Sequence, residues 1–322
     1  MENASIELKT NQEKKVHIKG FFSRLYDQRH LQMMAFPGFI WMFVFCYMPM
    51  YGIIIAFKDY NILKPMLSAP WADKSGFFHF FEFFQDENFI TVLINTVGIS
   101  FFKILIGFPL PILFAILLNE LRQASFKRVV QTVTYLPHFI SWVILGGLMM
   151  NWLADIGLIN DVLINLKLIK EPIFYLAEPK YFWGIAVLSD AWKETGWNAI
   201  IYLAAISSID PQLYEASTID GCNRWRQVWN ITLPGIMPTV VTLLILNIGG
   251  LMGVGFEKII LMYSPATYST ADVISTYVYR RGIIGAQFGF GTAVGVFNSV
   301  INFGLLFFAN RISKHVTEIS LW

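Results

Sequence analysis

Residues 210–238 read DPQLYEASTIDGCNRWRQVWNITLPGIMP, lie between two long apolar runs, and predict two short helices joined by a turn. Asp210 can cap a first helix that begins at Pro211, because a proline at the first helical position gives up no hydrogen bond. Gly221 suits the left-handed residue that often follows a helix. Asn223 can then cap the second helix. The stretch therefore predicts a compact helix–turn–helix exposed to water.

The second of these helices carries an apolar stripe. Trp225, Val228 and Trp229 fall at i, i+3 and i+4, so they share one face. Two tryptophans in a polar loop are expected to bury against a surface, either the ends of the protein's own helices or a groove on a partner. We expect Pro234 to end this helix and to force Leu233 out of the helical region.

The same stretch resembles a family signature. The binding-protein-dependent permeases of ATP-binding-cassette (ABC) importers carry a loop of the form E-A-A, three residues, G, nine residues, I-x-L-P. The spacing here is complete, and Ser217 in place of the second alanine is the one departure. The resemblance implies a coupling helix that docks in a cleft of an ATPase subunit. The coupling residues that it implies are Glu215, Ala216, Ser217, Gly221, Ile231, Leu233 and Pro234.

A narrower resemblance covers most of the chain. Stretches such as MPMYGIIIAFKDYN, TYLPHFISWVI and DAWKETGWNAIIYLAAISSIDPQLYEA look like the sugar-permease branch, and most like its polysaccharide or lipoprotein permeases. The resemblance implies a type I, MetI-like core that moves an oligosaccharide or polysaccharide fragment by alternating access. It also implies partners: a second and different permease, a dimer of ATPase subunits that use ATP and Mg, and an extracellular or periplasmic solute-binding protein.

Composition independently indicates a membrane protein. Of the 322 residues 55% are hydrophobic and 14% are charged, against about 25% charged in soluble domains. Aromatic residues reach 16%, which suits interfacial belts in contact with lipid. The net charge of +2 gives no sign of a nucleic-acid partner. Cys46 and Cys222 lie in different contexts, so we expect free thiols. The five histidines are scattered, and we expect no metal site.

Six apolar runs have roughly the 20 residues that cross a bilayer, so we expect an all-α integral membrane protein with six transmembrane helices. The predicted spans are 35–57, 90–118, 129–153, 182–206, 236–262 and 290–309. The expected organisation is an N-terminal tail over 1–34, a first span and outer loop over 35–89, a five-helix core over 90–309 with the coupling loop at about 207–235, and a C-terminal tail over 310–322.

The distribution of basic residues predicts the orientation of these spans. The termini and the loops on their side carry 13 Lys and Arg, and the opposite loops carry 8. The positive-inside rule therefore places both termini and the coupling loop in the cytoplasm. The outer loops are rich in aromatic residues, which either anchor at the interface or form a platform for an external partner.

Ionisable and polar residues inside the spans suggest a substrate pathway, because charges at membrane depth usually face a bundle interior or water. Sugars are bound by polar groups flanked by aromatic faces. The candidate pathway residues are Asp190, Trp192, Glu194, Trp197 and Asn247. The alternative is structural: Asp190 and Lys193, at i and i+3, can neutralise each other and lock the fourth span to its neighbours. Asn247 can equally contact substrate or bridge helices.

The remaining charges have simpler expected roles. We expect Lys103 to pair with an acidic neighbour or to reach toward the interface. Glu257 and Lys258 are expected near the outer interface, where charge costs little. The glycines of the fifth span are expected to allow close helix packing or, alternatively, to line a channel.

The sequence also argues against covalent chemistry in this chain. It holds no phosphate-binding loop, nucleophile elbow or dinucleotide motif, so we expect no catalytic residue and no cofactor bound by this chain. Two alternatives stay open, namely the same machinery for a non-sugar solute and an ion-coupled secondary transporter. In the second case Asp190 and Glu194 would be ion sites, but the coupling-loop motif and the lack of an evident inverted repeat argue against it.

Cys222 offers a test of the orientation, because it lies in the predicted cytoplasmic loop. In a Cys46→Ser background, a membrane-impermeant thiol reagent should leave Cys222 unlabelled in intact cells. The same reagent should label it in inverted vesicles from which peripheral subunits have been stripped. Labelling in intact cells as strong as in inverted vesicles would overturn this orientation.

Overall fold

The computed structural model describes residues 28–63 and 65–322, and every regular element within them is a helix. The one extended pairing in these ranges is an isolated bridge between Lys58 and Trp71. The all-α prediction is therefore confirmed. The chain divides into two compact units, one that ends at Ile54 and one that begins at Ile55. Most of the predicted N-terminal tail, residues 1–27, lies outside the described residues.

The first unit is a continuous apolar helical run that begins inside the predicted tail. It consists of α3 (Arg29–Met42), the π-helical η1 (Phe43–Tyr47), α4 (Met48–Met50) and the start of the 3-10 helix η2 (Tyr51–Phe57). Its large apolar side chains are mostly exposed, as a lipid-facing helix requires. The predicted span over 35–57 is thus helical throughout, with six residues added at its start.

The second unit begins with short elements, η3 (Met66–Ser68) and α5 (Phe78–Gln85), and then forms the predicted second span. That span is α6 (Phe89–Phe102), the π-helical η4 (Lys103–Gly107) and α7 (Pro109–Glu120). The π-turn stands directly before Pro109. A π-turn shifts the hydrogen-bond register, which allows the helical run to continue past prolines.

The third predicted span is wrong as a single helix. It is divided into α8 (Ala124–Phe139) and α9 (Trp142–Trp152), which meet at a bend of 99°. Pro137 lies in the last turn of α8, and the Ser141 hydroxyl accepts a hydrogen bond from the Ile144 N–H to cap α9. Proline before and a cap after the break explain why two helices form. A short helix, α10 (Leu158–Asn165), follows.

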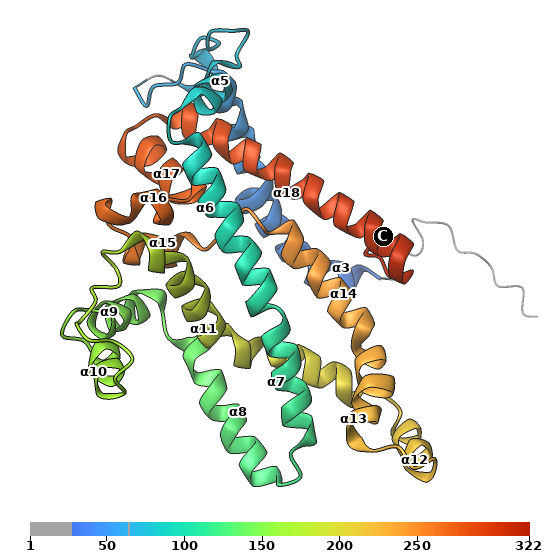
Figure 1. Cartoon of the computed structure of the whole chain (residues 1–322). Helices are drawn as coiled ribbons and strands as arrows, with labels where there is room; N and C mark the ends of the chain where they lie inside the picture. Colours follow the sequence, from blue (N-terminus) through green and yellow to red (C-terminus); the bar gives the residue numbers. More distant parts are fainter. Residues whose placement is uncertain (1–27, 64) are drawn as a thin grey trace, which may run out of the picture. The chain divides into compact units, whose positions relative to one another are not determined.

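The central element of the second unit is α11 (Pro179–Ser207), which confirms the predicted fourth helix. It packs against α7, α8 and the later α14 (Leu233–Gly249) (Figure 1). Gly196 makes the approach of α8 possible, since a Cβ there would lie 2.1 Å from the carbonyl oxygen of Thr134. The same helix carries Asp190, Lys193 and Glu194, which need partners of opposite charge or hydrogen-bonding groups from neighbouring segments.

The predicted coupling loop forms α12 (Pro211–Ile219) and α13 (Arg224–Gln227), followed by the π-helical η5 (Val228–Thr232) and α14. The expectation that Pro234 ends the second helix is wrong. Leu233 is helical, at φ −62° and ψ −48°, and the run continues from Arg224 to Gly249. The π-turn again precedes the proline and accommodates its missing N–H.

The predicted fifth span over 236–262 is also wrong as one helix, because it breaks after Gly249. Residues 250–255 leave the helix, and α15 (Phe256–Met262) begins after Gly255, whose φ is +88°. Partners satisfy the freed backbone, as a membrane interior demands. The Ser100 hydroxyl donates to the Leu251 carbonyl, and the Met252 N–H donates to Asn302 Oδ1 at 3.1 Å.

The chain then passes through η6 (Pro265–Thr267), α16 (Tyr268–Ala271), α17 (Ile274–Val278) and the π-helical η7 (Tyr279–Ile284) to α18 (Phe288–Thr317). Helices α14 and α18 pack side by side (Figure 1). A Cβ on Gly249 would come within 2.7 Å of Leu306 Cδ1, so this glycine serves close packing, as expected.

A charge cluster joins α5 to the segment before α18. Arg281 binds Glu82 at 2.6 Å and Asp86 at 2.5 Å, and the Tyr277 hydroxyl donates to Asp86 at 2.6 Å. Burial opposes the charge on Asp86, but hydrogen bonds from Tyr277 and Asn88 and the nearby Arg281 guanidinium outweigh it and lower the pKa of this carboxyl. Asp86 therefore stays ionised at neutral pH.

Four helical runs in the described residues are long and apolar enough to span a membrane, and a fifth is added if the bent α8–α9 pair counts as one span. The four are Arg29–Phe57, Phe89–Glu120, Arg224–Gly249 and Phe288–Thr317. Helix α11 is absent from this set, since it carries Asp190, Lys193 and Glu194. The total of six spans stays a prediction that depends both on α11 and on the bent α8–α9 pair.

Candidate functional site

The helix–turn–helix after α11 has the caps that its sequence predicts. The Asp210 carboxylate accepts a hydrogen bond from the Gln212 N–H at 2.9 Å, and Asn223 Oδ1 accepts one from the Arg226 N–H at 2.9 Å. Gly221 has φ +77°, which confirms its left-handed conformation. No other group lies within 4 Å of the position that its Cβ would take, so a glycine is needed here for backbone conformation and not for space.

Side chains brace the two short helices against each other. Gln227 Nε2 donates to Ser217 Oγ at 2.9 Å and to Thr218 Oγ1 at 3.0 Å. The hydroxyls of Tyr214 and Thr232 lie 2.9 Å apart and share a hydrogen bond. Ser217, the one departure from the expected motif, thus contributes an acceptor that alanine would lack.

The apolar stripe of Trp225 in α13 and Val228 and Trp229 in η5 is divided between core and surface. Val228 is buried in a cluster with Ile206 and Ile236, whereas the side chains of Trp225 and Trp229 are 71% and 67% exposed. The two tryptophans are therefore not buried against the protein's own helices, and a partner groove is the alternative that remains. Of the other motif positions, Glu215, Ala216 and Pro234 are exposed, and Ile231 and Leu233 are half-buried.

The loop lies at the same end of the unit as the turn between α7 and α8 (Figure 1). Arg224 of α13 reaches Glu120 at the end of α7, with Nη1 3.3 Å from Oε2. The pair is exposed and contributes little stability by itself. Its value here is positional, since it ties α13 to the end of α7.

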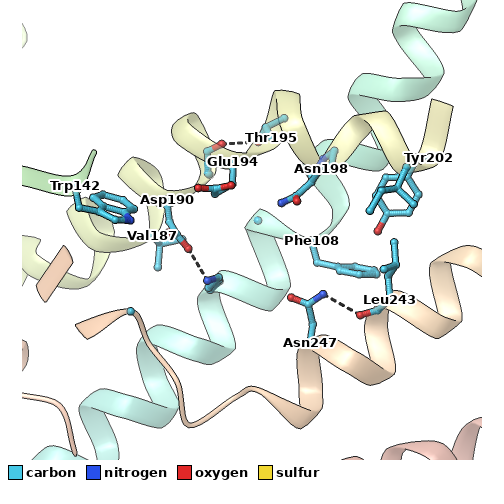
Figure 2. Close-up of a pocket in the computed structure, with 16 residues that line it drawn as sticks. Phe108, Trp142, Val187, Asp190, Glu194, Thr195, Asn198, Tyr202, Leu243 and Asn247 are labelled. Atoms are coloured by element: carbon cyan, nitrogen blue, oxygen red, sulfur yellow. Dashed lines mark hydrogen bonds and ion pairs between the residues drawn. The ribbon is translucent and has the colours of Figure 1, made fainter. Parts of the chain in front are cut away.

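A second feature is a pocket of about 390 Å³ between the α6–α7 run, α11 and α14. Its polar lining includes Lys103, Asp190, Glu194, Thr195, Asn198 and Asn247. Figure 2 shows Glu194 and Asn198 projecting from α11 on the side that faces Asn247 of α14, Asp190 pointing to the α6–η4 run, and Phe108 and Tyr202 close by. Three predicted pathway residues, Asp190, Glu194 and Asn247, therefore meet at one pocket. Trp192 and Trp197 are not among the residues that line it.

Asp190 does not pair with Lys193, so this part of the structural alternative is wrong, but it does tie α11 to neighbouring segments. Its Oδ2 lies 2.8 Å from Lys103 Nζ, and its Oδ1 lies 3.3 Å from Lys258 Nζ. Lys103 belongs to η4 and Lys258 to α15, so one carboxylate ties three segments together. The prediction that Lys103 finds an acidic partner is confirmed. Lys258, expected at the outer interface, is instead only 2% exposed.

Glu194 has a separate set of partners. Its Oε2 lies 2.8 Å from His138 Nδ1, and its Oε1 lies 3.6 Å from Lys193 Nζ. The His138 ring is stacked on Trp197, with ring centroids 4.3 Å apart and planes at 1°. Trp197 is therefore connected to the pocket by way of His138 and Glu194, a connection that the sequence did not reveal because His138 lies on a different helix, α8.

The pocket offers hydrogen-bond donors, acceptors and aromatic faces, which is the set of groups that binds sugar hydroxyls. Asn247 Nδ2 donates to the Leu243 carbonyl at 2.8 Å, which leaves its amide oxygen for other partners. In the described residues no cluster of His, Cys, Asp or Glu could hold a metal ion. Cys46 and Cys222 are free thiols, as expected.

The chain matches one protein family and is similar to named relatives. The model of the family described as "Binding-protein-dependent transport system inner membrane component" matches residues 107–318. The polygalacturonan/rhamnogalacturonan transport system permease protein YteP of Bacillus subtilis (strain 168) is 42% identical over 310 residues, which cover 96% of this chain and 95% of that protein.

Two solved structures are also similar. One is a bacterial ABC transporter involved in the import of the acidic polysaccharide alginate, with 42% identity and a TM-score of 0.83 over 92% of this chain and 99% of that chain. The other is a bacterial alginate ABC transporter in complex with alginate pentasaccharide-bound periplasmic protein, with 41% identity and a TM-score of 0.84 over 94% and 99%.

The pairing of Asp190 predicts a strong effect of its removal. Asp190→Asn leaves Lys258 buried without its counter-charge, so the assembled complex in detergent should be destabilised by about 3–5 kcal/mol in thermal unfolding. The double variant Asp190→Asn/Lys258→Met should recover much of this loss, because it removes the stranded charge. Equal melting of Asp190→Asn and wild type would show that the buried pair is not structural.

Proposed function

The chain belongs to the family of binding-protein-dependent transport system inner membrane components, and from this premise we propose that it forms the permease path of an ABC importer for oligosaccharides. The MetI-like permease fold expected from the sequence is confirmed. The permease is a transport component of the importer. The sugar crosses the cytoplasmic membrane by alternating access, in which the pocket opens to one side at a time.

One observation carries this proposal: only a short connection separates the motif loop from α11, and the loop continues directly into α14, and both of these helices line the pocket. Helix α11 ends at Ser207, four residues before α12 begins at Pro211. On the other side, the helical run from Arg224 passes into α14 without interruption. A displacement of the loop is therefore transmitted along α11 to Asp190 and Glu194 and along α14 to Asn247.

The loop also has the surface that a docking element needs. Its exposed Trp225 and Trp229 and its exposed Glu215 offer apolar area and a charge to a partner. We assign this partner as a separate ATPase subunit that uses ATP and Mg. The basic-residue count supports a cytoplasmic position for the loop and both termini.

The relatives point to the substrate and to the other partners. They are named for polygalacturonan/rhamnogalacturonan and for alginate, which are carbohydrates rich in uronic acids. We therefore assign a uronic-acid oligosaccharide as substrate. The related complex contains a periplasmic protein loaded with an alginate pentasaccharide, which supports delivery by an external binding protein. A second permease chain completes the path. The ion-coupled alternative receives no support from these relatives.

Gly221 allows a direct test of coupling. Any residue with a Cβ at φ +77° costs about 1–2 kcal/mol of local strain, and Gly221→Asp adds bulk and negative charge at the docking surface. We expect normal membrane insertion, loss of ATPase subunits on purification and loss of sugar uptake.

Gly221→Ala is the matched control for this test, because the space around its Cβ is open and only the backbone strain remains. This variant should keep a measurable fraction of ATPase binding and uptake. If the Gly221→Asp complex retains its ATPase subunits and takes up sugar at the wild-type rate, the loop is not the coupling element.

A further inference from the structure

The charges around the pocket do not cancel. Three lysines, Lys103, Lys193 and Lys258, meet two carboxylates, Asp190 and Glu194. Three lysines against two carboxylates leave one positive charge in excess, before any charge on His138 is counted. A surplus charge in a site sheltered from water attracts a mobile ion of opposite sign more strongly than it would in bulk water.

Two of the three lysines are fully engaged. Lys258 is 2% exposed, binds Asp190, donates to the Ala186 carbonyl at 3.2 Å and lies 5.8 Å from the Trp142 ring centroid. Lys193, whose side chain is 6% exposed, binds Glu194, donates to the carbonyl oxygens of Pro137 and His138 and lies near the same ring. Neither ammonium faces the pocket.

Lys103 differs from both. Its side chain is 41% exposed, and within the described residues its ammonium has one ion-pair partner, Asp190. It lines the 390 Å³ pocket and also a neighbouring pocket of about 240 Å³, where Asn247 and Gly253 lie as well. It stands at the first position of the π-helical turn η4, and π-turns inside helices are frequent at functional sites.

Asp190 can release Lys103 without being left alone. Lys258 holds the opposite oxygen of the carboxylate, so the acid keeps a buried counter-charge when Lys103 turns away. Lys103 then has donors for a second anion at the border of the two pockets. A lysine ammonium presents three hydrogen-bond donors and no acceptor. It therefore binds a carboxylate, which only accepts and carries the opposite charge, more strongly than a neutral hydroxyl.

We propose that Lys103 binds a carboxylate of the transported sugar and so selects uronic-acid oligosaccharides over neutral ones. The proposal rests on the proposed function as a permease. It assigns the selection to the permease path itself, in addition to any selection by the binding protein. Asp190 is then the group that positions Lys103 between passages of substrate.

The test uses the whole complex in proteoliposomes, with both permeases, the ATPase subunits and saturating binding protein. The probes are trigalacturonate and its methyl ester, and the readout is the ratio of their uptake rates. Lys103→Gln should lower this ratio by about tenfold or more, the effect of losing one charge-assisted hydrogen bond. Lys103→Arg should keep the ratio near that of wild type.

Lys180→Gln is the matched control, since Lys180 is an exposed lysine of α11 outside both pockets, and its ratio should be unchanged. Subunit stoichiometry and thermal unfolding report whether Lys103→Gln assembles. If it does not, Lys103→Met, which keeps an apolar stem, gives the same comparison. An equal loss of both probes, or an unchanged ratio, overturns the proposal. Uptake of neither probe by the wild-type complex would instead remove the proposed function.

Discussion

The carboxylate of Asp190, held between Lys103 and Lys258, is the interaction on which the arrangement of the second unit depends. It joins the π-turn η4, the centre of α11 and the short helix α15, which are far apart in sequence. Charges at this depth are costly unless paired, so the three segments must meet for any of them to be stable. The pocket lies beside this junction. Lys258 is occupied by its ion pair with Asp190, whereas polar groups such as Asn198 and Asn247 face the pocket.

The same junction explains why the fifth predicted span breaks. Gly255 turns the chain with a positive φ and starts α15, and Lys258 reaches Asp190 from the first turn of that helix. A Cβ at Gly255 would contact the Lys258 side chain at 3.5 Å. A straight helix through residues 250–255 would have carried Lys258 toward the interface, as the sequence suggested, and would have left Asp190 with one partner fewer.

Local signals in the sequence were sufficient for local structure. Caps at Asp210 and Asn223 and the left-handed Gly221 follow from short-range chemistry, and all three are present. Pro234 misled because a π-turn, which has no clear sequence signal, absorbed its missing N–H. The pairing of Asp190 with Lys193 failed for another reason: helical spacing shows which residues are near on one helix, but not which partners other helices bring closer.

The candidate docking loop and the pocket therefore share the same two helices, α11 and α14. We propose that the exposed loop between α11 and α14 meets a partner, while the inner parts of α11 and α14 face the polar pocket. The π-turn η4 borders the pocket, and the π-turn η5 lies where the loop passes into α14. In the proposed mechanism, helices α11 and α14 would transmit the closure of the ATPase partner from the docking loop to the pocket.

The most direct measurement of this account is sugar uptake by the complete complex in sealed proteoliposomes, with the energy source varied. Labelled trigalacturonate is supplied with its binding protein, with ATP present or absent on the side of the ATPase subunits. Uptake should require ATP and the binding protein and should continue when a protonophore collapses the proton gradient. Uptake that continues without ATP and stops with the protonophore would contradict it.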